Sequence, residues 1–132
     1  MTGGKRAVLA LAGVAAMAGP VQAQGVMRPL YCLFTVDCAI SALPDCAART
    51  FSVEVAPIDH EAGLWFSYDG FALSVEDVTP SDTPMSYFLS AGYEEAVLLT
   101  VFDTGAALHL RQFSLPGSGP AQETARGQCE VL

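Results

Sequence analysis

Alternation of apolar and polar residues is the clearest pattern in this sequence, and it begins at Phe51. The run Phe51–Val55 has the period of two that is typical of a strand with one buried face. A second alternating stretch, Leu64–Val78, is interrupted by Asp69-Gly70, which favours a two-residue hairpin turn. That loop brings six residues onto one apolar face in three cross-strand pairs: Tyr68 with Phe71, Phe66 with Leu73, and Leu64 with Val75. A slip by one residue would mix this face with the polar one, so the register is well specified.

A second hairpin is predicted between Glu95 and Leu115, with its turn near Thr104-Gly105. Pairing Phe102 with Ala107 gives one apolar, buried face: Val97, Leu99, Val101, Leu108 and Leu110. The other face, predicted to meet solvent, then carries Leu98, Thr100, His109 and Arg111. Two further strands are predicted at Ser86–Tyr93 and Glu123–Val131.

Short strands joined by tight turns, without crossover helices, indicate an all-β fold. An antiparallel meander with one apolar face must close or stack, so we expect a small barrel or a sandwich. Residues 51–132 form the antiparallel β domain, and residues 24–50 are predicted to be an irregular, cysteine-rich segment of the same structural unit. Within that segment, Asp37 could cap a short helix over Cys38–Leu43.

The first 23 residues have the three parts of an export signal. Lys5 and Arg6 precede an uncharged apolar run at residues 7–19, and small residues stand before a cleavage point expected after Ala23. The apolar run is shorter than the roughly 20 residues that a membrane-spanning helix needs, which favours cleavage over a retained anchor. We therefore expect a periplasmic or secreted protein without a membrane span.

Removal of the signal would leave an acidic domain without lysine. Residues 24–132 contain four arginines against fourteen aspartates and glutamates, a net charge of −10 with neutral histidines. Such a surface repels phosphate backbones and anionic lipids, so nucleic acid and membrane surfaces are not expected partners. A basic periplasmic or envelope protein would be attracted instead.

Four cysteines in an exported chain predict two disulfides, which would stabilise the domain. Three pairings are possible, and we favour Cys38 with Cys46 and Cys32 with Cys129. The first closes a short loop, and the second ties the start of the domain to its last strand. A metal site is the alternative, but the spacings lack the close C-x-x-C pairs that zinc and iron–sulfur sites generally use.

The sequence offers little catalytic chemistry. His60 stands in an acidic turn that could supply half of a metal site, although a solvated turn is the simpler interpretation. No G-x-S-x-G nucleophile motif and no phosphate-binding glycine loop occur. We therefore expect no enzyme activity, no cofactor and no catalytic or metal-binding residues. Trp65, predicted on the polar face of the first hairpin, is a candidate partner contact, unless a second layer covers it.

The order of elements resembles small bacterial periplasmic β proteins to which no function is attached. The features shared are the signal peptide, the cysteine-rich start, the meander and a last strand ending in Gly127–Glu130. A weaker likeness is to periplasmic inhibitors of C-type lysozyme, through Tyr31-Cys32, the hairpin around Tyr68-Asp69-Gly70, and Cys129. That likeness implies a small secreted β-barrel with a disulfide to a C-terminal cysteine. The inhibitory Ser-Gly-x-x-x-Tyr loop and the lysine of that family are missing here.

These observations favour a non-enzymatic exported binding module for a protein partner, for example an inhibitor. Two alternatives stay open: a barrel that carries a small apolar ligand, and a purely structural envelope protein.

Overall fold

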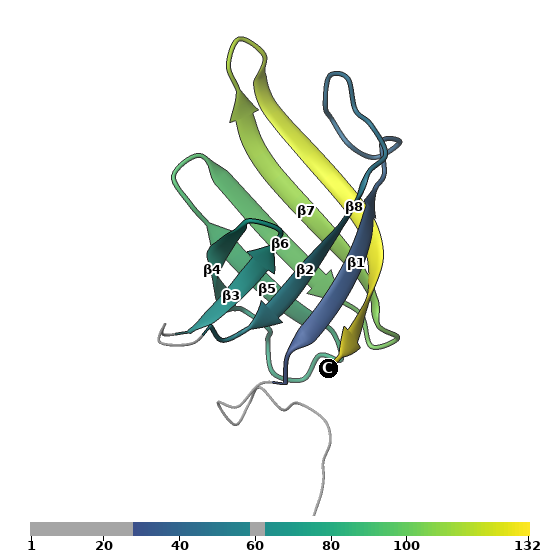
Figure 1. The fold of residues 1–132 in the computed structure, drawn as a ribbon, viewed down its shortest axis with the longest axis vertical. Helices are drawn as coiled ribbons and strands as arrows, with labels where there is room; N and C mark the ends of the chain where they lie inside the picture. Colours follow the sequence, from purple (N-terminus) through teal and green to yellow (C-terminus); the bar gives the residue numbers. More distant parts are fainter. Residues whose placement is uncertain (1–27, 59–62) are drawn as a thin grey trace, which may run out of the picture.

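The computed structural model describes residues 28–58 and 63–132. These residues form eight strands in a closed antiparallel barrel, in which each strand pairs with the next and the last pairs with the first (Figure 1). The strands are β1 (Leu30–Val36), β2 (Thr50–Ala56), β3 (Leu64–Tyr68), β4 (Phe71–Asp77), β5 (Ser86–Ala91), β6 (Glu95–Val101), β7 (Ala106–Leu115) and β8 (Gly119–Val131). The predicted all-β meander is confirmed, and of the two architectures expected it is the barrel.

The N-terminal part of the domain contradicts two predictions. Part of the segment predicted to be irregular, Leu30–Val36, is β1, which closes the barrel by pairing with β2 and β8. The period of two was hidden because apolar side chains occupy both faces, with Leu33 pointing outward and 47% exposed. The predicted helix over Cys38–Leu43 is also absent. The Asp37 carboxylate instead accepts a hydrogen bond from the Ala39 amide at 2.9 Å, which forms a local turn.

The β3–β4 hairpin has the predicted register. Tyr68 lies opposite Phe71, Phe66 opposite Leu73 and Leu64 opposite Val75. The apolar face points into the barrel, where Phe66 is fully buried. Trp65, opposite Ser74, is half-buried on the outer face.

The β6–β7 hairpin differs from its prediction by one residue. Val101, and not Phe102, lies opposite Ala107, so five residues separate the pair where four were expected. Because the side-chain period of a strand is two, this shift exchanges the faces of β7 relative to β6. His109 is consequently buried in the barrel, 2% exposed, and not on the solvent face. Leu108 and Leu110, predicted to be buried, occupy the outer positions of β7, where they are half-buried.

The apolar core fills one end of the barrel. Its largest fully buried apolar side chains come from β1, β2, β3, β5 and β6: Phe34, Val53, Val55, Phe66, Phe88, Val97 and Leu99. The predicted disulfides are both confirmed. Cys32–Cys129 joins β1 to β8 within the core, and Cys38–Cys46 closes the loop between β1 and β2.

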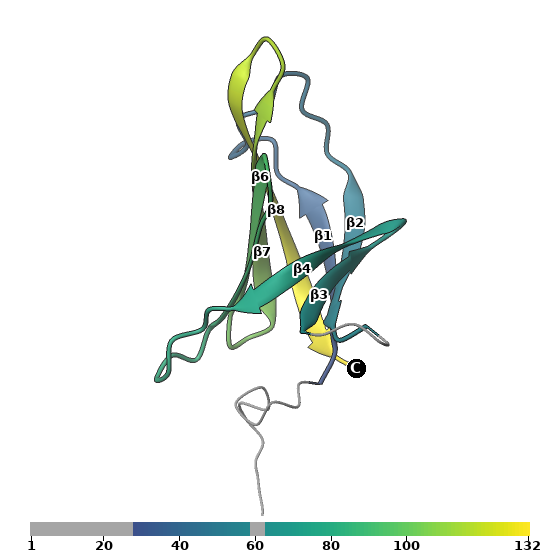
Figure 2. The same ribbon diagram turned by 90° about the vertical axis from the view of Figure 1, so that its left-hand side faces the viewer.

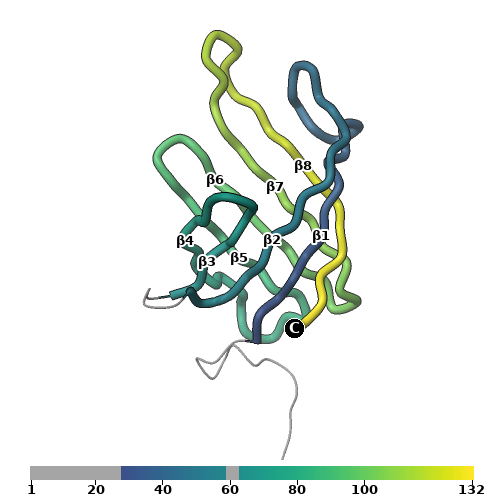
Figure 3. Tube along the Cα trace, viewed as in Figure 1, coloured from purple at the N-terminus to yellow at the C-terminus, as the bar shows by residue number. Residues whose placement is uncertain are grey.

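The other end of the barrel is open. β4 and β5 pair only through Glu76 with Leu89 and Asp77 with Phe88. Figure 2 shows β4 running obliquely to the nearly upright β6 and β7. The β7–β8 hairpin and the β1–β2 connection project beyond the other strands at this end (Figure 3). We call this open end the mouth.

The disulfides place the chain in an oxidising, extracellular compartment. The predicted signal peptide lies outside the described residues. Among the residues described, no helix is long and apolar enough to cross a membrane.

Candidate functional site

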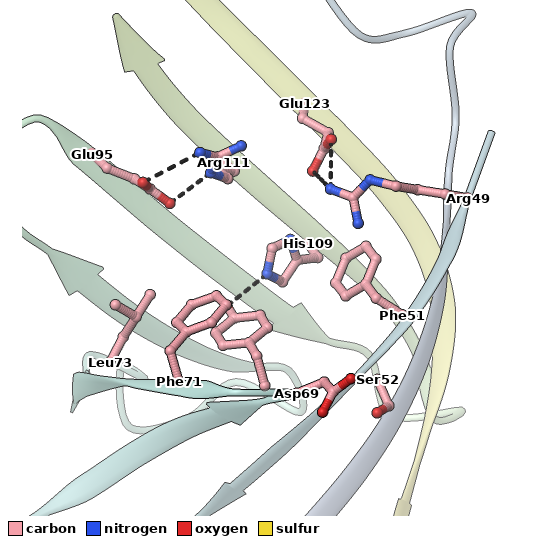
Figure 4. A pocket seen from close by; sticks show the side chains of 11 residues that line it. Arg49, Phe51, Ser52, Asp69, Phe71, Leu73, Glu95, His109, Arg111 and Glu123 are labelled. Atoms are coloured by element: carbon pink, nitrogen blue, oxygen red, sulfur yellow. Dashed lines mark hydrogen bonds and ion pairs between the residues drawn. The ribbon is translucent and has the colours of Figure 1, made fainter. Parts of the chain in front are cut away.

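The mouth contains a cavity of about 560 Å³. It lies above the apolar core and is bordered by β2, β3, β4, β6, β7 and β8. Its lining residues are Arg49, Phe51, Ser52, Tyr68, Asp69, Phe71, Leu73, Glu95, His109, Arg111 and Glu123 (Figure 4). The size falls within the range of roughly 300–1,000 Å³ that is typical of small-molecule sites.

The inner wall of the cavity consists of aromatic rings. Tyr68 and Phe71, at the β3–β4 turn, are stacked with their ring centres 4.7 Å apart. Phe51 on β2 packs edge-on against His109, with centres 5.0 Å apart, and Tyr68 packs edge-on against the same ring at 5.9 Å. Phe34 is fully buried below these rings, and its ring centre lies 5.4 Å from that of His109. It therefore joins the aromatic wall to the core. Phe71 is 57% exposed, so the wall is accessible at its edge.

His109 is the buried polar group of the site. Its Nε2 is 2.9 Å from the Tyr68 hydroxyl, which is a hydrogen bond whose direction depends on the imidazole tautomer. The other ring nitrogen, Nδ1, is buried and has no hydrogen-bond partner in the described part of the chain. Burial lowers the pKa of His109 to about 4, and the nearby charges of Arg111 and Arg49 act in the same direction. Burial also raises the pKa of Tyr68, so the pair is neutral at pH 7.

Two arginine–glutamate ion pairs stand above the rings. Arg49 donates through Nη2 to both carboxylate oxygens of Glu123, at 3.0 and 2.9 Å. Arg111 donates through Nε to Glu95 at 2.6 Å, and its guanidinium lies over the ring of Phe113, 4.0 Å from the centre. Figure 4 shows the two guanidinium groups on either side of His109. The inward side chains of β7 and β8 thus change from apolar to charged toward the mouth.

A second, smaller hollow of about 380 Å³ adjoins the cavity where β4 and β5 diverge. The two share Leu73, Glu95 and Arg111. The hollow continues past Val97 and Phe113 to Tyr93, which is 97% exposed in the β5–β6 turn. The cavity therefore borders the gap between β4 and β5.

The residues that the sequence singled out do not build this site. Trp65 lies on the outer face, away from the cavity lining, and His60 lies outside the described residues. In the described ranges no three histidine, cysteine or acidic side chains gather as a metal site would require. His109, predicted on the solvent face of its strand, lines the cavity together with Glu95.

Sequence reasoning missed the two ion pairs for different reasons. Glu95 and Arg111 lie diagonally across one hairpin, so the correct β6–β7 register would have indicated their contact. Arg49 and Glu123 are 74 residues apart, and only the closure of the barrel brings them together.

A search of protein-family models, of curated proteins and of solved structures finds no match for this chain. The site must therefore be interpreted from its own chemistry. It offers aromatic surface, guanidinium donors held by carboxylates, and a neutral imidazole–phenol pair.

We expect acid to destabilise the fold through His109. The unfolded chain binds this proton near the ordinary pKa of 6.5, but the folded chain binds it only near 4. Between these values the unfolded state holds more protons, so stability falls as the pH is lowered, by about 2–3 kcal/mol in total. The measurement is urea unfolding of the wild type and of His109→Gln between pH 7 and pH 4. The variant keeps His60 and all carboxylates but lacks the titration of His109. The free energies of unfolding of the two proteins should therefore converge as the pH falls toward 4. Parallel profiles would contradict the assignment.

Proposed function

We propose that the protein is a non-enzymatic binding protein of an oxidising compartment, and that it holds a small molecule with an apolar, ring-containing body in the mouth of the barrel. The observation that carries the proposal is the cavity of about 560 Å³ lined by Phe51, Tyr68 and Phe71. Eight-stranded barrels are wide enough to hold one small ligand when side chains leave part of the interior free. Here the core occupies one end only, which leaves the aromatic wall of the mouth available.

The ionisation of the site supports binding without catalysis. A general base works best with a pKa near the working pH. The pKa of His109 lies far below neutrality, at about 4, and that of Tyr68 is raised above its ordinary value. Both groups therefore keep one protonation state near pH 7, which suits them to holding a ligand by packing and hydrogen bonding.

A protein partner is the second candidate, favoured by exposed aromatic side chains at the same end of the barrel. Phe71 and Tyr93 are 57% and 97% exposed, next to the acidic residues Asp69 and Glu94. Aromatic residues are enriched at interfaces, and the acidic chain would attract a basic partner. The expected basic envelope protein thus stays a prediction. Trp65 does not strengthen it, since its half-buried position lies away from the mouth.

Titration with 1-aminoanthracene, an uncharged fluorescent ring compound, tests the small-molecule proposal. We expect saturable fluorescence enhancement with one site per chain. Phe71→Ala should weaken binding roughly three- to tenfold, because it removes one face of the aromatic wall. Leu33→Ala is the matched control: Leu33 is similarly exposed, at 47%, but lies on the outer face of β1. Absence of saturable binding, or equal effects of the two variants, would contradict the proposal.

A further inference from the structure

The distribution of positive charge in this chain points to the polar group of the ligand. Residues 24–132 contain fourteen acidic residues but only four arginines and no lysine. Two of these four arginines, Arg49 and Arg111, line the same cavity. A third, Arg126, forms an ion pair with Asp37 outside it, with Nε and Oδ2 2.8 Å apart. Half of these arginines therefore lie at the mouth, where the lining also contains Asp69, Glu95 and Glu123.

The guanidinium group of Arg49 is more accessible than the carboxylate that holds it. The Glu123 side chain is 8% exposed, whereas that of Arg49 is 53% exposed. Toward the described residues Arg49 donates only through Nη2, which leaves the donors on Nε and Nη1 for another acceptor. A molecule that enters the cavity thus meets the arginine, while the glutamate behind it fixes the orientation of the guanidinium.

Arg111 is also held by a glutamate, on the other side of His109, but here the arginine side chain is 32% exposed and the Glu95 side chain 38%. Glu95 accepts from Nε and Nη2, at 2.6 and 3.4 Å, and the ring of Phe113 supports the guanidinium plane. The donors on Nη1 have no partner among the described residues. Arginines held in this manner lose little conformational entropy when they bind an anion, and their planar donors match a carboxylate.

The depth of the site limits the body of the ligand. Below the aromatic wall the barrel is filled by Phe34, Phe66 and Phe88, all fully buried, so a long chain has no room along the barrel axis. A body of one or two fused rings can lie against Phe51, Tyr68 and Phe71 without displacing the core. Stacking against such rings is favoured for a flat aromatic body.

We propose that the occupant of the mouth is a small aromatic carboxylate, with its ring system against Phe51, Tyr68 and Phe71 and its carboxylate bound by Arg49 and Arg111. This inference rests on the proposed small-molecule function. It also predicts selectivity, because the acidic remainder of the chain gives no general attraction for anions. Preference for the acid must then come from the two arginines.

Three compounds that share one naphthalene body test the charge requirement: 2-naphthoate, 2-naphthamide and 2-naphthylmethylammonium. Isothermal titration calorimetry at pH 7 should give the acid an affinity at least about tenfold higher than the amide, since its hydrogen bonds are charge-assisted. The ammonium compound should bind more weakly than the amide. Acid and amide binding equally, or the ammonium compound binding best, would overturn the carboxylate assignment but leave the proposed function intact. Failure of all three to bind would contradict the proposed function itself.

Paired variants separate the role of the arginines from the stability of the fold. Arg49→Gln with Glu123→Gln, and Arg111→Gln with Glu95→Gln, each remove one ion pair without leaving a charge unpaired. Either double variant should reduce the affinity for the acid about tenfold and leave that for the amide unchanged. The control is Arg126→Gln with Asp37→Asn, which removes the ion pair outside the cavity. An equal loss in the control would overturn the inference, and the wild-type preference for acid over amide decides it even if a variant fails to fold.

Discussion

Replacement of Cys32 and Cys129 by alanine is expected to lower the free energy of unfolding by about 4–5 kcal/mol, the chain-entropy value for a crosslink that closes a loop of about 100 residues. The two cysteines are 97 residues apart, so the bond removes many conformations from the unfolded chain. It also joins the first and last strands, where the barrel closes. A domain of this size has a total stability of roughly 5–15 kcal/mol, so the variant would lose a large share of it.

The second disulfide is the internal control for this prediction. Cys38 and Cys46 are only 8 residues apart, and the same model gives roughly 2–3 kcal/mol for so short a loop. Urea unfolding of the two double-alanine variants, each with its remaining disulfide oxidised, would rank them. If removal of Cys38–Cys46 destabilises the protein as much as removal of Cys32–Cys129, loop length does not account for the effect.

The parts of the fold that could be predicted are those in which local signals agree. The β3–β4 hairpin has a strong turn signal at Asp69-Gly70, and its two faces differ clearly in polarity, so one register satisfies both. The disulfides followed from the expected compartment and from the position of Cys129 near the end of the domain. For the hairpin, neighbouring residues carry this information; for the disulfides, four cysteines allow only three pairings.

The β6–β7 hairpin was mispredicted because its two faces are both largely apolar. Leu98, Leu108 and Leu110 occupy outer positions, so either register leaves leucines outside the core. The observed register is distinguished by its tertiary contacts. It places His109 among Phe34, Phe51 and Tyr68, and brings Arg111 to Glu95. None of these partners except Glu95 belongs to the hairpin, which is why periodicity alone could not find the site.

The mouth itself is a product of barrel closure. Arg49 and Phe51 reach it from the start of β2, Tyr68 and Phe71 from a hairpin turn, and Glu123 from β8. A sequence pattern can place each residue on a face of its own strand, but the relative positions of these strands depend on register all round the barrel. The candidate site was therefore beyond prediction, whereas the all-β class was not.

Closure depends on one further residue, Gly127, which lies opposite Phe34 where β8 crosses β1. A Cβ added at Gly127 would stand 2.6 Å from the Phe34 ring and even closer to the backbone carbonyl oxygen of Leu33. Backbone cannot move aside as a flexible side chain does, so Gly127→Ala must separate β1 from β8 or shift their pairing. We expect a loss of more than about 3 kcal/mol, beyond the usual range for overpacking.

Gly92→Ala is the matched control for this substitution. The nearest atom to a Cβ there is the Glu95 carbonyl oxygen at 3.6 Å, an ordinary contact, and the φ angle of Gly92 is not in the left-handed region. Its stability should change by less than about 1 kcal/mol, with a small gain from the reduced entropy of the unfolded chain. Thermal and urea unfolding of the two variants decide the matter. A Gly127→Ala protein as stable as Gly92→Ala would contradict the close approach of β1 and β8 at this position.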